Sequence, residues 1–148
     1  MSIFPTFNNE LKEEIKTETF GTKEPLFDFK KKRIVMKDGK VVMATKIEQV
    51  MQWIELLIRT EVDKYEVYKG TDFGMTNLYA LRGHSLFETP FFIMELEREI
   101  KEKIEGKNDV SSVTDIKIEY NFNKLLISIT VVLKSGETLT REVEYDNL

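Results

Sequence analysis

The 148-residue sequence contains no cysteine and only one histidine. The missing cysteine excludes disulfides, thiolate-bound zinc, iron–sulfur clusters and a cysteine nucleophile, and it fits a reducing compartment. Carboxylates remain as the available metal ligands, and alone they would hold only a hard ion. We therefore expect no metal site and no cofactor.

The sequence also lacks long apolar runs and an excess of basic residues. No stretch approaches the roughly 18 apolar residues that a membrane-spanning helix needs. The N-terminus lacks the basic start and apolar run of a secretory signal, so we expect the protein to stay where it is made or to leave inside an assembly. The net charge of −4 argues against a nucleic-acid partner. One basic cluster, Lys30–Arg33, lies in a segment that we predict as a strand, where it would discourage sheet-to-sheet aggregation.

Length and composition are those of one globular domain. Hydrophobic residues make up 41% of the chain and charged residues 32%. Residues 1–25 are polar and show no sustained periodicity, so we expect an N-terminal arm. Residues 26–148 then form a single α+β domain.

The first half of that domain predicts a hairpin and a helix. Asp38-Gly39 separates two β-prone runs and is the dipeptide that a type I′ turn favours. Thr45 and Glu48 have the spacing of a capping box, and the apolar residues behind them recur at intervals of three and four. We predict a helix over residues 46–61, with Trp53 on the flank of its buried face.

The second half predicts another helix and three strands. Thr89-Pro90 has the pattern of a helix start, and Gly106 that of a left-handed helix end. Alternating apolar residues then predict strands near 114–120, 125–133 and 139–145, of which the second is apolar enough on both faces to be central. The fold class is therefore α+β, with two main helices packed on an antiparallel or mixed sheet.

Asp72-Phe73-Gly74 is the tripeptide with which protein kinases bind magnesium. The Gly-rich loop, the strand lysine and the His-Arg-Asp loop of a kinase are absent, so we interpret the tripeptide as a turn. His84 lies in a Gly-containing loop, where histidine is usually a surface or capping residue. Glycoside hydrolysis needs only two carboxylates, but none of the abundant acids is singled out as a catalytic pair. The acids considered are Glu61, Asp63, Asp72, Glu88 and Glu95.

Aromatic residues are concentrated around the central loop. Such residues are either a second core layer or part of a protein interface, and we expect some to serve each role. Phe73 is expected to pack inward, with Tyr65 and Tyr68 partly available to a partner. The set comprises Tyr65, Tyr68, Phe73, Tyr79, Phe87, Phe91 and Phe92.

Several segments taken in order carry a resemblance over roughly residues 3–145. "IFPTF" is followed by "FDFKKKRIV", by the helix "IEQVMQWIELLIRTE" and by "DKYEVYKGTDFGM". This order resembles the short baseplate wedge proteins of contractile phage tails, the lysozyme-like or sheath-initiator baseplate family, and most closely its branch in PBSX-like prophages. The matching positions are Phe27, Phe29, Trp53, Thr60, Glu61, Tyr65, Tyr68, Phe73 and Gly74.

The chain departs from this family at two points. Val62 stands where an arginine often follows Thr-Glu, and Glu24-Pro25 is followed by Leu26 instead of completing a Glu-Pro-Arg motif. Any contact that those arginines make in relatives is not expected here.

The resemblance implies a structural protein, not an enzyme, with a fold similar to the handshake domain of the sheath. It implies a ring of copies around the tail tube that binds larger wedge subunits, the sheath and possibly tube or hub proteins. Assembly would take place in the host cytoplasm and end in the virion baseplate. The last strand could add a sheath strand by β-augmentation. The interface residues that we expect are Tyr65, Tyr68, Asp72, Phe73, Leu139, Arg141, Val143 and Tyr145.

Two other functions remain open at this point. One is a small peptidoglycan-acting hydrolase, and the other is an unrelated protein-binding adaptor domain.

Overall fold

The computed structural model describes residues 23–80, 89–121 and 124–146. The chain divides into two compact units, Met1–Thr45 and Lys46–Leu148. The expected arm lies almost entirely outside the described residues, and its boundary at residue 25 stays a prediction.

The described part of the first unit contains two small antiparallel sheets of two strands each. Its strands are β1 (Phe27–Asp28), β2 (Arg33–Ile34), β3 (Met36–Lys37) and β4 (Lys40–Val41). Asp38 and Gly39 both have positive φ, 51° and 74°, between β3 and β4. The type I′ hairpin turn predicted from this dipeptide is therefore confirmed.

The sequence predicted that the basic cluster lies in a strand, but in the structure most of the cluster lies in a turn. Lys30 and Lys31 belong to a turn between β1 and β2, and both amides donate to Asp28 Oδ1 at 3.0 Å. These hydrogen bonds hold the pKa of Asp28 below its usual value. Lys32, at φ 53°, completes the reversal. The side chain of Asp28 therefore stabilises a turn that strand propensity alone would not favour.

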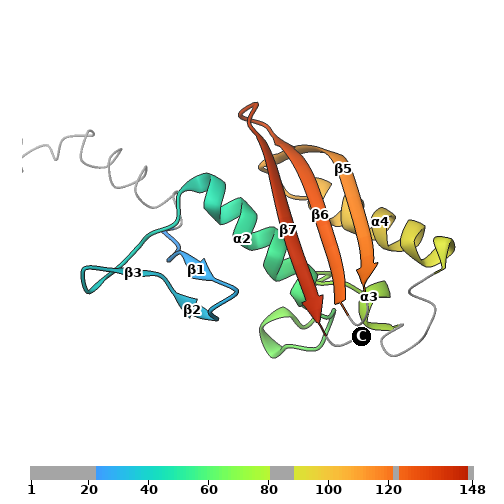
Figure 1. Ribbon diagram of the computed structural model, residues 1–148, viewed down its shortest axis with the longest axis horizontal. Helices are drawn as coiled ribbons and strands as arrows, with labels where there is room; N and C mark the ends of the chain where they lie inside the picture. Colours follow the sequence, from blue (N-terminus) through green and yellow to red (C-terminus); the bar gives the residue numbers. More distant parts are fainter. Residues whose placement is uncertain (1–22, 81–88, 122–123, 147–148) are drawn as a thin grey trace, which may run out of the picture. The chain divides into compact units, whose positions relative to one another are not determined.

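The second unit consists of helices on one face of a three-stranded antiparallel sheet (Figure 1). The sheet order is β5-β6-β7, with α4 packed against β5 and α2 against β7. This arrangement confirms the predicted α+β class. The elements are α2 (Lys46–Arg59), the 3₁₀ helix η1 (Glu66–Tyr68), α3 (Asn77–Ala80), α4 (Pro90–Glu105), β5 (Val110–Asn121), β6 (Lys124–Leu133) and β7 (Thr138–Asp146).

Helix α2 begins where the sequence predicts and ends two residues early. Thr60 Oγ1 donates to the Leu56 carbonyl at 2.6 Å, and Glu61 forms a parallel bridge with Met75. The pairing with Met75 draws the chain away from the helix axis, so the helix ends at Arg59.

Helix α4 has the predicted start and a different end. Pro90 occupies the first turn behind Thr89, although the Thr89 side chain makes no capping hydrogen bond. Gly106 follows the helix with φ −69° and ψ −14°, so it is right-handed and not the left-handed cap that we expected. The chain continues into tight turns instead, because Lys107 N donates to the Ile104 carbonyl and Val110 N to the Lys107 carbonyl, both at 3.1 Å.

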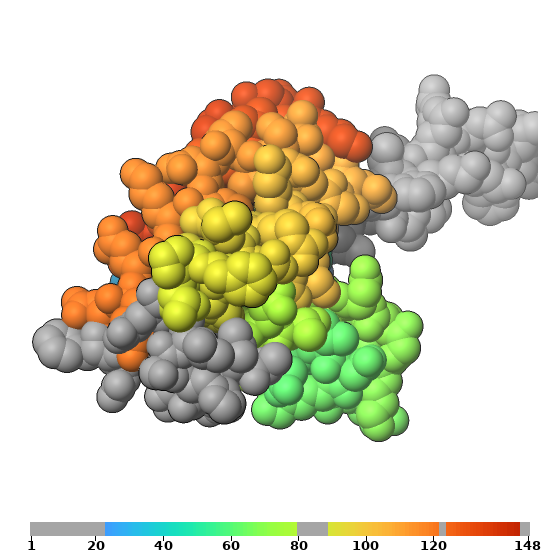
Figure 2. Space-filling model, turned by 90° about the vertical axis from the view of Figure 1, so that its right-hand side faces the viewer, coloured from blue at the N-terminus to red at the C-terminus, as the bar shows by residue number. Residues whose placement is uncertain are grey.

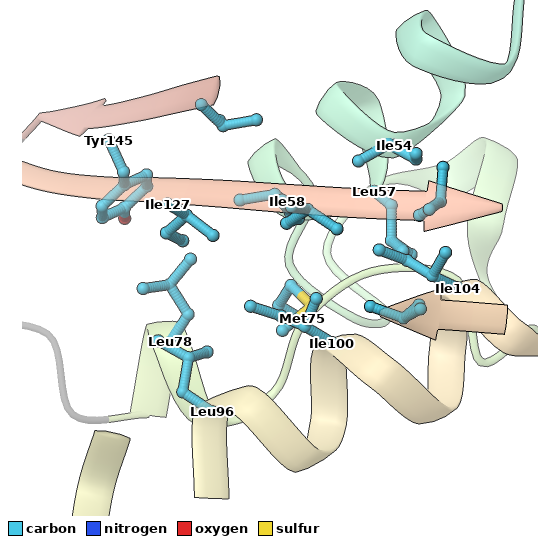
Figure 3. Close-up of a cluster of buried hydrophobic side chains, with 14 of the residues drawn as sticks. Ile54, Leu57, Ile58, Met75, Leu78, Leu96, Ile100, Ile104, Ile127 and Tyr145 are labelled. Carbon is cyan, nitrogen blue, oxygen red and sulfur yellow. The ribbon is translucent and has the colours of Figure 1, made fainter. Parts of the chain in front are cut away.

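One hydrophobic core lies between the helices and the sheet (Figure 3). Ile54, Leu57 and Ile58 of α2 meet Leu96, Ile100 and Ile104 of α4 above the inner face of the sheet. Met75 and Leu78 fill the space between the two helices and are fully buried.

Strand β6 is central, as predicted, but it is buried on one face only. Leu125, Ile127, Ile129, Val131 and Leu133 are buried in the core. On the other face Leu126 is exposed and Ser128, Thr130 and Val132 are half-buried. The apolar residues on both faces predicted the central position of β6, and helices cover one of these faces.

Candidate functional site: the free edge of strand β7

Strand β7 forms one edge of the sheet. Its odd-numbered and even-numbered residues direct their backbone N–H and C=O groups to opposite sides of the strand. Leu133 N donates to the Glu137 carbonyl at 2.8 Å at the start of the β6–β7 hairpin. Because backbone groups alternate in direction along a strand, the odd-numbered residues from Leu139 to Tyr145 point their N–H and C=O groups toward β6. The even-numbered residues Thr138, Thr140, Glu142 and Glu144 therefore point theirs away from the sheet.

This edge is regular and largely open. Strand β7 pairs with β6 without a bulge from Thr138 to Asp146. No hydrogen bond from the described residues reaches the backbone groups of Thr138, Thr140 or Glu142 on the outer side. An open edge of this kind is a template for another strand.

The opposite edge of the sheet is protected over its first half. Register shifts interrupt β5 between Val110 and Ser112 and again between Val113 and Asp115. Glu105, at the end of α4, accepts a hydrogen bond from Val113 N at 3.1 Å. Bulges and a side-chain cap both discourage strand pairing, so β7 is the better template.

A buried carboxylate ties β7 to α2. Glu55 has a side-chain exposure of 5% and lies between two arginines. Its Oε1 accepts hydrogen bonds from Arg59 at 3.1 and 3.2 Å, and its Oε2 accepts from Arg141 Nε at 2.8 Å and also from Arg141 Nη2. Both carboxylate oxygens are thus paired, which offsets the desolvation of the charge.

Arg59 also reaches the edge itself. Its Nη2 donates to the Glu144 carbonyl at 3.1 Å, from the outer side of β7. One end of the template is therefore already occupied by a side chain of α2, and the open stretch runs from Thr138 to Glu142.

The four interface residues predicted on β7 lie mainly on the inner side. Leu139, Val143 and Tyr145 are buried against the helices, and Arg141 is half-buried beside Glu55. Tyr145 packs edge-on against Tyr79, with ring centroids 5.6 Å apart. Their side chains stabilise the domain, and the groups directed outward are the backbone atoms of the residues between them.

Asp72-Phe73-Gly74 forms the close approach of the central loop to the end of α2. Gly74 has φ +114°, and a Cβ atom there would lie 2.7 Å from the Thr60 carbonyl oxygen. Met75 N donates to that same oxygen at 2.7 Å. Asp72 is exposed, and its carbonyl accepts from Lys103 Nζ at 2.5 Å. The tripeptide therefore has a structural explanation as the part of the loop that returns to the end of α2.

The predicted aromatic residues of this loop divide between packing and exposure. Phe73 lies between Tyr68 and Trp53, with centroid distances of 4.6 and 6.0 Å. Lys107 Nζ stands 4.7 Å from the centre of the Trp53 ring, a cation–π contact. Tyr65 is exposed and Tyr68 half-buried. Tyr68 and Phe73 are thus brought together.

The adjacent aromatics of α4 divide in the same way. Phe92 is buried in the core, whereas Phe91 is 74% exposed and Met94 lies exposed one turn later. Figure 2 shows the α4 side of the molecule, with the first turns of the helix, drawn in yellow, at the surface. Phe87, the remaining aromatic of the predicted set, lies outside the described residues.

One of the acidic residues considered for hydrolysis, Glu95, is paired with a cation. A general acid needs a raised pKa, but the hydrogen bond that Arg98 donates to Glu95 at 2.8 Å holds the pKa of Glu95 below its usual value. His84 and Glu88 lie outside the described residues. Over the described ranges, no three or more His, Asp or Glu side chains are grouped to hold a metal ion, and no helix there could span a membrane.

Sequence reasoning missed the residues that support the edge. Glu55 and Arg59 share one helix flank at i and i+4, a spacing that predicts an ion pair but not its burial. Glu99 is a second buried acid, whose two oxygens accept from Thr76 N at 2.6 Å and Asn77 N at 3.0 Å. Glu55 and Glu99 each interrupt the apolar face of a helix, and this interruption was the sequence signal that could have identified them.

Comparison with known proteins identifies the family. The family model described as "contractile injection system sheath initiator" matches residues 23–136, which is most of the chain. A search of curated proteins finds no match. The matched segment extends from the short strands of the first unit through both long helices and the central strand to the β6–β7 turn. The chain therefore belongs to the contractile injection system sheath initiator family, whose members are structural assembly components.

Proposed function

We propose that this protein is a baseplate component that starts the sheath by lending the free edge of β7 to a strand of the first sheath subunit. In this proposal, copies stand in a ring around the tail tube, bind larger wedge subunits and assemble in the host cytoplasm. The open stretch of β7, from Thr138 to Glu142, is the observation that carries it. Strand addition uses main-chain hydrogen bonds, so it needs an unpaired, regular edge.

The side chains of β7 fit this role. The odd-numbered residues hold the strand to the core and, through Arg141, to Glu55 of α2. A template fixed in this way loses little conformational freedom when a second strand is added. The buried side chains do not need to touch the partner.

The test is a proline on the outer side of the edge. Glu142→Pro removes an outward N–H and leaves the bonds to β6 in place, because proline is tolerated where the missing donor faces solvent. Glu142→Thr is the matched control, since it removes the carboxylate and keeps the N–H. Tails isolated from a producing strain are examined by electron microscopy, and thermal unfolding of each purified variant checks its fold.

We expect Glu142→Pro to give tubes with baseplates that contain the protein but carry no sheath. Glu142→Thr should give sheathed, contractile tails. Normal sheathing of a well-folded Glu142→Pro variant would refute strand addition at β7.

A further inference from the structure

The open stretch of β7 ends beside a positive charge. Arg59 and Arg141, here called the arginine pair, share a single carboxylate, that of Glu55. The side chain of Glu55 is 5% exposed, whereas those of Arg59 and Arg141 are 35% and 32% exposed. The cluster thus contains two positive charges and one negative charge, and the positive groups are the ones that reach the surface.

The arginine pair lies on the helix side of the sheet, at the edge itself. The side chain of Arg141 reaches Glu55 on α2, and α2 packs against β7 (Figure 1). Arg59 Nη2 donates to the Glu144 carbonyl from the outer side of β7. A strand added to this edge would therefore lie directly beside both guanidinium groups.

The other acids of β7 and α2 do not neutralise this charge. Glu142 and Glu144 are even-numbered residues, so their side chains point to the opposite face of the sheet from Arg141. Glu48 lies on α2 two turns before Glu55, about 10 Å away along the helix axis. Within the described residues, Arg141 forms its ion pair with Glu55 alone. The surplus positive charge is therefore available to a partner.

Strand pairing determines which side chain of an added strand meets this charge. Thr140 and Glu142 direct their backbone groups outward, so Arg141 lies between two positions that would bond to the added strand. Residues directly opposite each other in a sheet point their side chains to the same face, with Cβ atoms about 5 Å apart. The residue opposite Arg141 therefore points to the helix side and meets the guanidinium groups.

We infer that the strand added to β7 carries Asp or Glu opposite Arg141. This inference rests on the proposed strand addition and specifies the chemistry of the added strand. Opposite charges that face each other across paired strands stabilise the pairing, whereas Lys or Arg there would add a third positive charge. A neutral apolar residue would remove the guanidinium groups from water without giving them a partner.

The arginine pair also sets the register of the added strand. A shift of two residues toward Thr138 would place the acid opposite Leu139, which is buried in the core. A shift in the other direction would require pairing at Glu144, whose carbonyl is already occupied by Arg59. One register therefore satisfies both the charge and the backbone, and a strand without the acid is rejected.

Two variants of the full chain, each with one photo-crosslinking amino acid, test the inference. The replaced residues are Thr140 and Glu142, whose side chains are exposed on the face away from the arginine pair. Tails are isolated from producing cells after irradiation, and mass spectrometry identifies the crosslinked residues of the partner. The two adducts should lie two residues apart in one segment, so that the residue between them is the one opposite Arg141. We expect that residue to be Asp or Glu.

The possible outcomes separate this inference from strand addition itself. Paired adducts with any other residue between them would overturn the inference and leave strand addition in place. If the adducts do not lie two residues apart in one segment, no strand is paired with β7 and both are overturned.

Charge reversal in the partner tests the energetic contribution. Replacing the mapped acid by Lys should lower the yield of the adduct from position 142 about fivefold. The same change at the residue opposite Thr140, which points to the other face, is the matched control and should leave the yield unchanged. In this chain, Arg141→Gln should lower the yield and Arg98→Gln, which removes an exposed arginine of α4, should not. Thermal unfolding checks the fold of both variants, and an unchanged yield after the charge reversal would overturn the inference.

Discussion

Replacing Gly74 by alanine tests how closely the central loop approaches the end of α2. At φ +114°, a non-glycine residue costs about 1 to 3 kcal/mol in backbone strain. The new Cβ would also lie 2.7 Å from the Thr60 carbonyl oxygen and 3.0 Å from Val62 N. If the loop moves away to relieve this clash, the hydrogen bond from Met75 N to the Thr60 carbonyl is broken, at a cost of about 1 kcal/mol. We expect Gly74→Ala to lower the free energy of unfolding by roughly 2 to 4 kcal/mol, and Tm by about 10 °C.

Gly70→Ala is the matched control for this prediction. Gly70 also has positive φ, +78°, but no atom lies within 4 Å of the position that its Cβ would take. Only the cost of the positive φ applies, so we expect Gly70→Ala to lower the free energy of unfolding by about 1 kcal/mol. Thermal and urea unfolding followed by circular dichroism compare the two variants. Equal destabilisation would refute the argument, because the close approach would then contribute nothing.

Three further predictions concern buried polar groups. Glu55→Gln should lower the free energy of unfolding by about 2 to 3 kcal/mol in urea unfolding, since two partly exposed arginines lose their shared charge; an unchanged midpoint would contradict this. Glu99→Gln should cost about 1 to 2 kcal/mol by the same measurement, because one amide oxygen cannot replace two carboxylate oxygens. Burial raises the pKa of Tyr79 above that of the unfolded chain, so stability should be full below pH 10 and decline as pH rises further. Tyr79→Phe should remove this decline, as measured by unfolding at pH 8 and pH 11.

Local sequence signals predicted those elements in which local and tertiary preferences agree. The Asp38-Gly39 turn follows from the positive φ of both residues, and the start of α4 from Pro90. The central position of β6 follows from its apolar content. In each case a short stretch of sequence contains the cause of the structure.

Local side-chain hydrogen bonds and long-range contacts explain the remaining differences. The turn at Lys30 depends on amide bonds to Asp28, and the end of α2 depends on Met75, more than a dozen residues away. That β7 is an edge strand, on which the proposed strand addition depends, could be expected, because the apolar content of the preceding strand predicts that strand to be central. The support of β7 by Glu55 could not, because periodicity marks a face as buried without showing which charges pair across it.

Alternate residues of β7, a strand of nine residues, are subject to two different evolutionary constraints. Substitutions at Leu139 or Val143 alter the core, so they are limited by folding in every particle that uses this domain. Substitutions at Thr140 or Glu142 alter side chains on the uncovered face, next to the groups that an added strand would meet. Under the proposed strand addition, lineages could therefore change their partner strand through alternate positions of β7 while the domain that presents it stays the same.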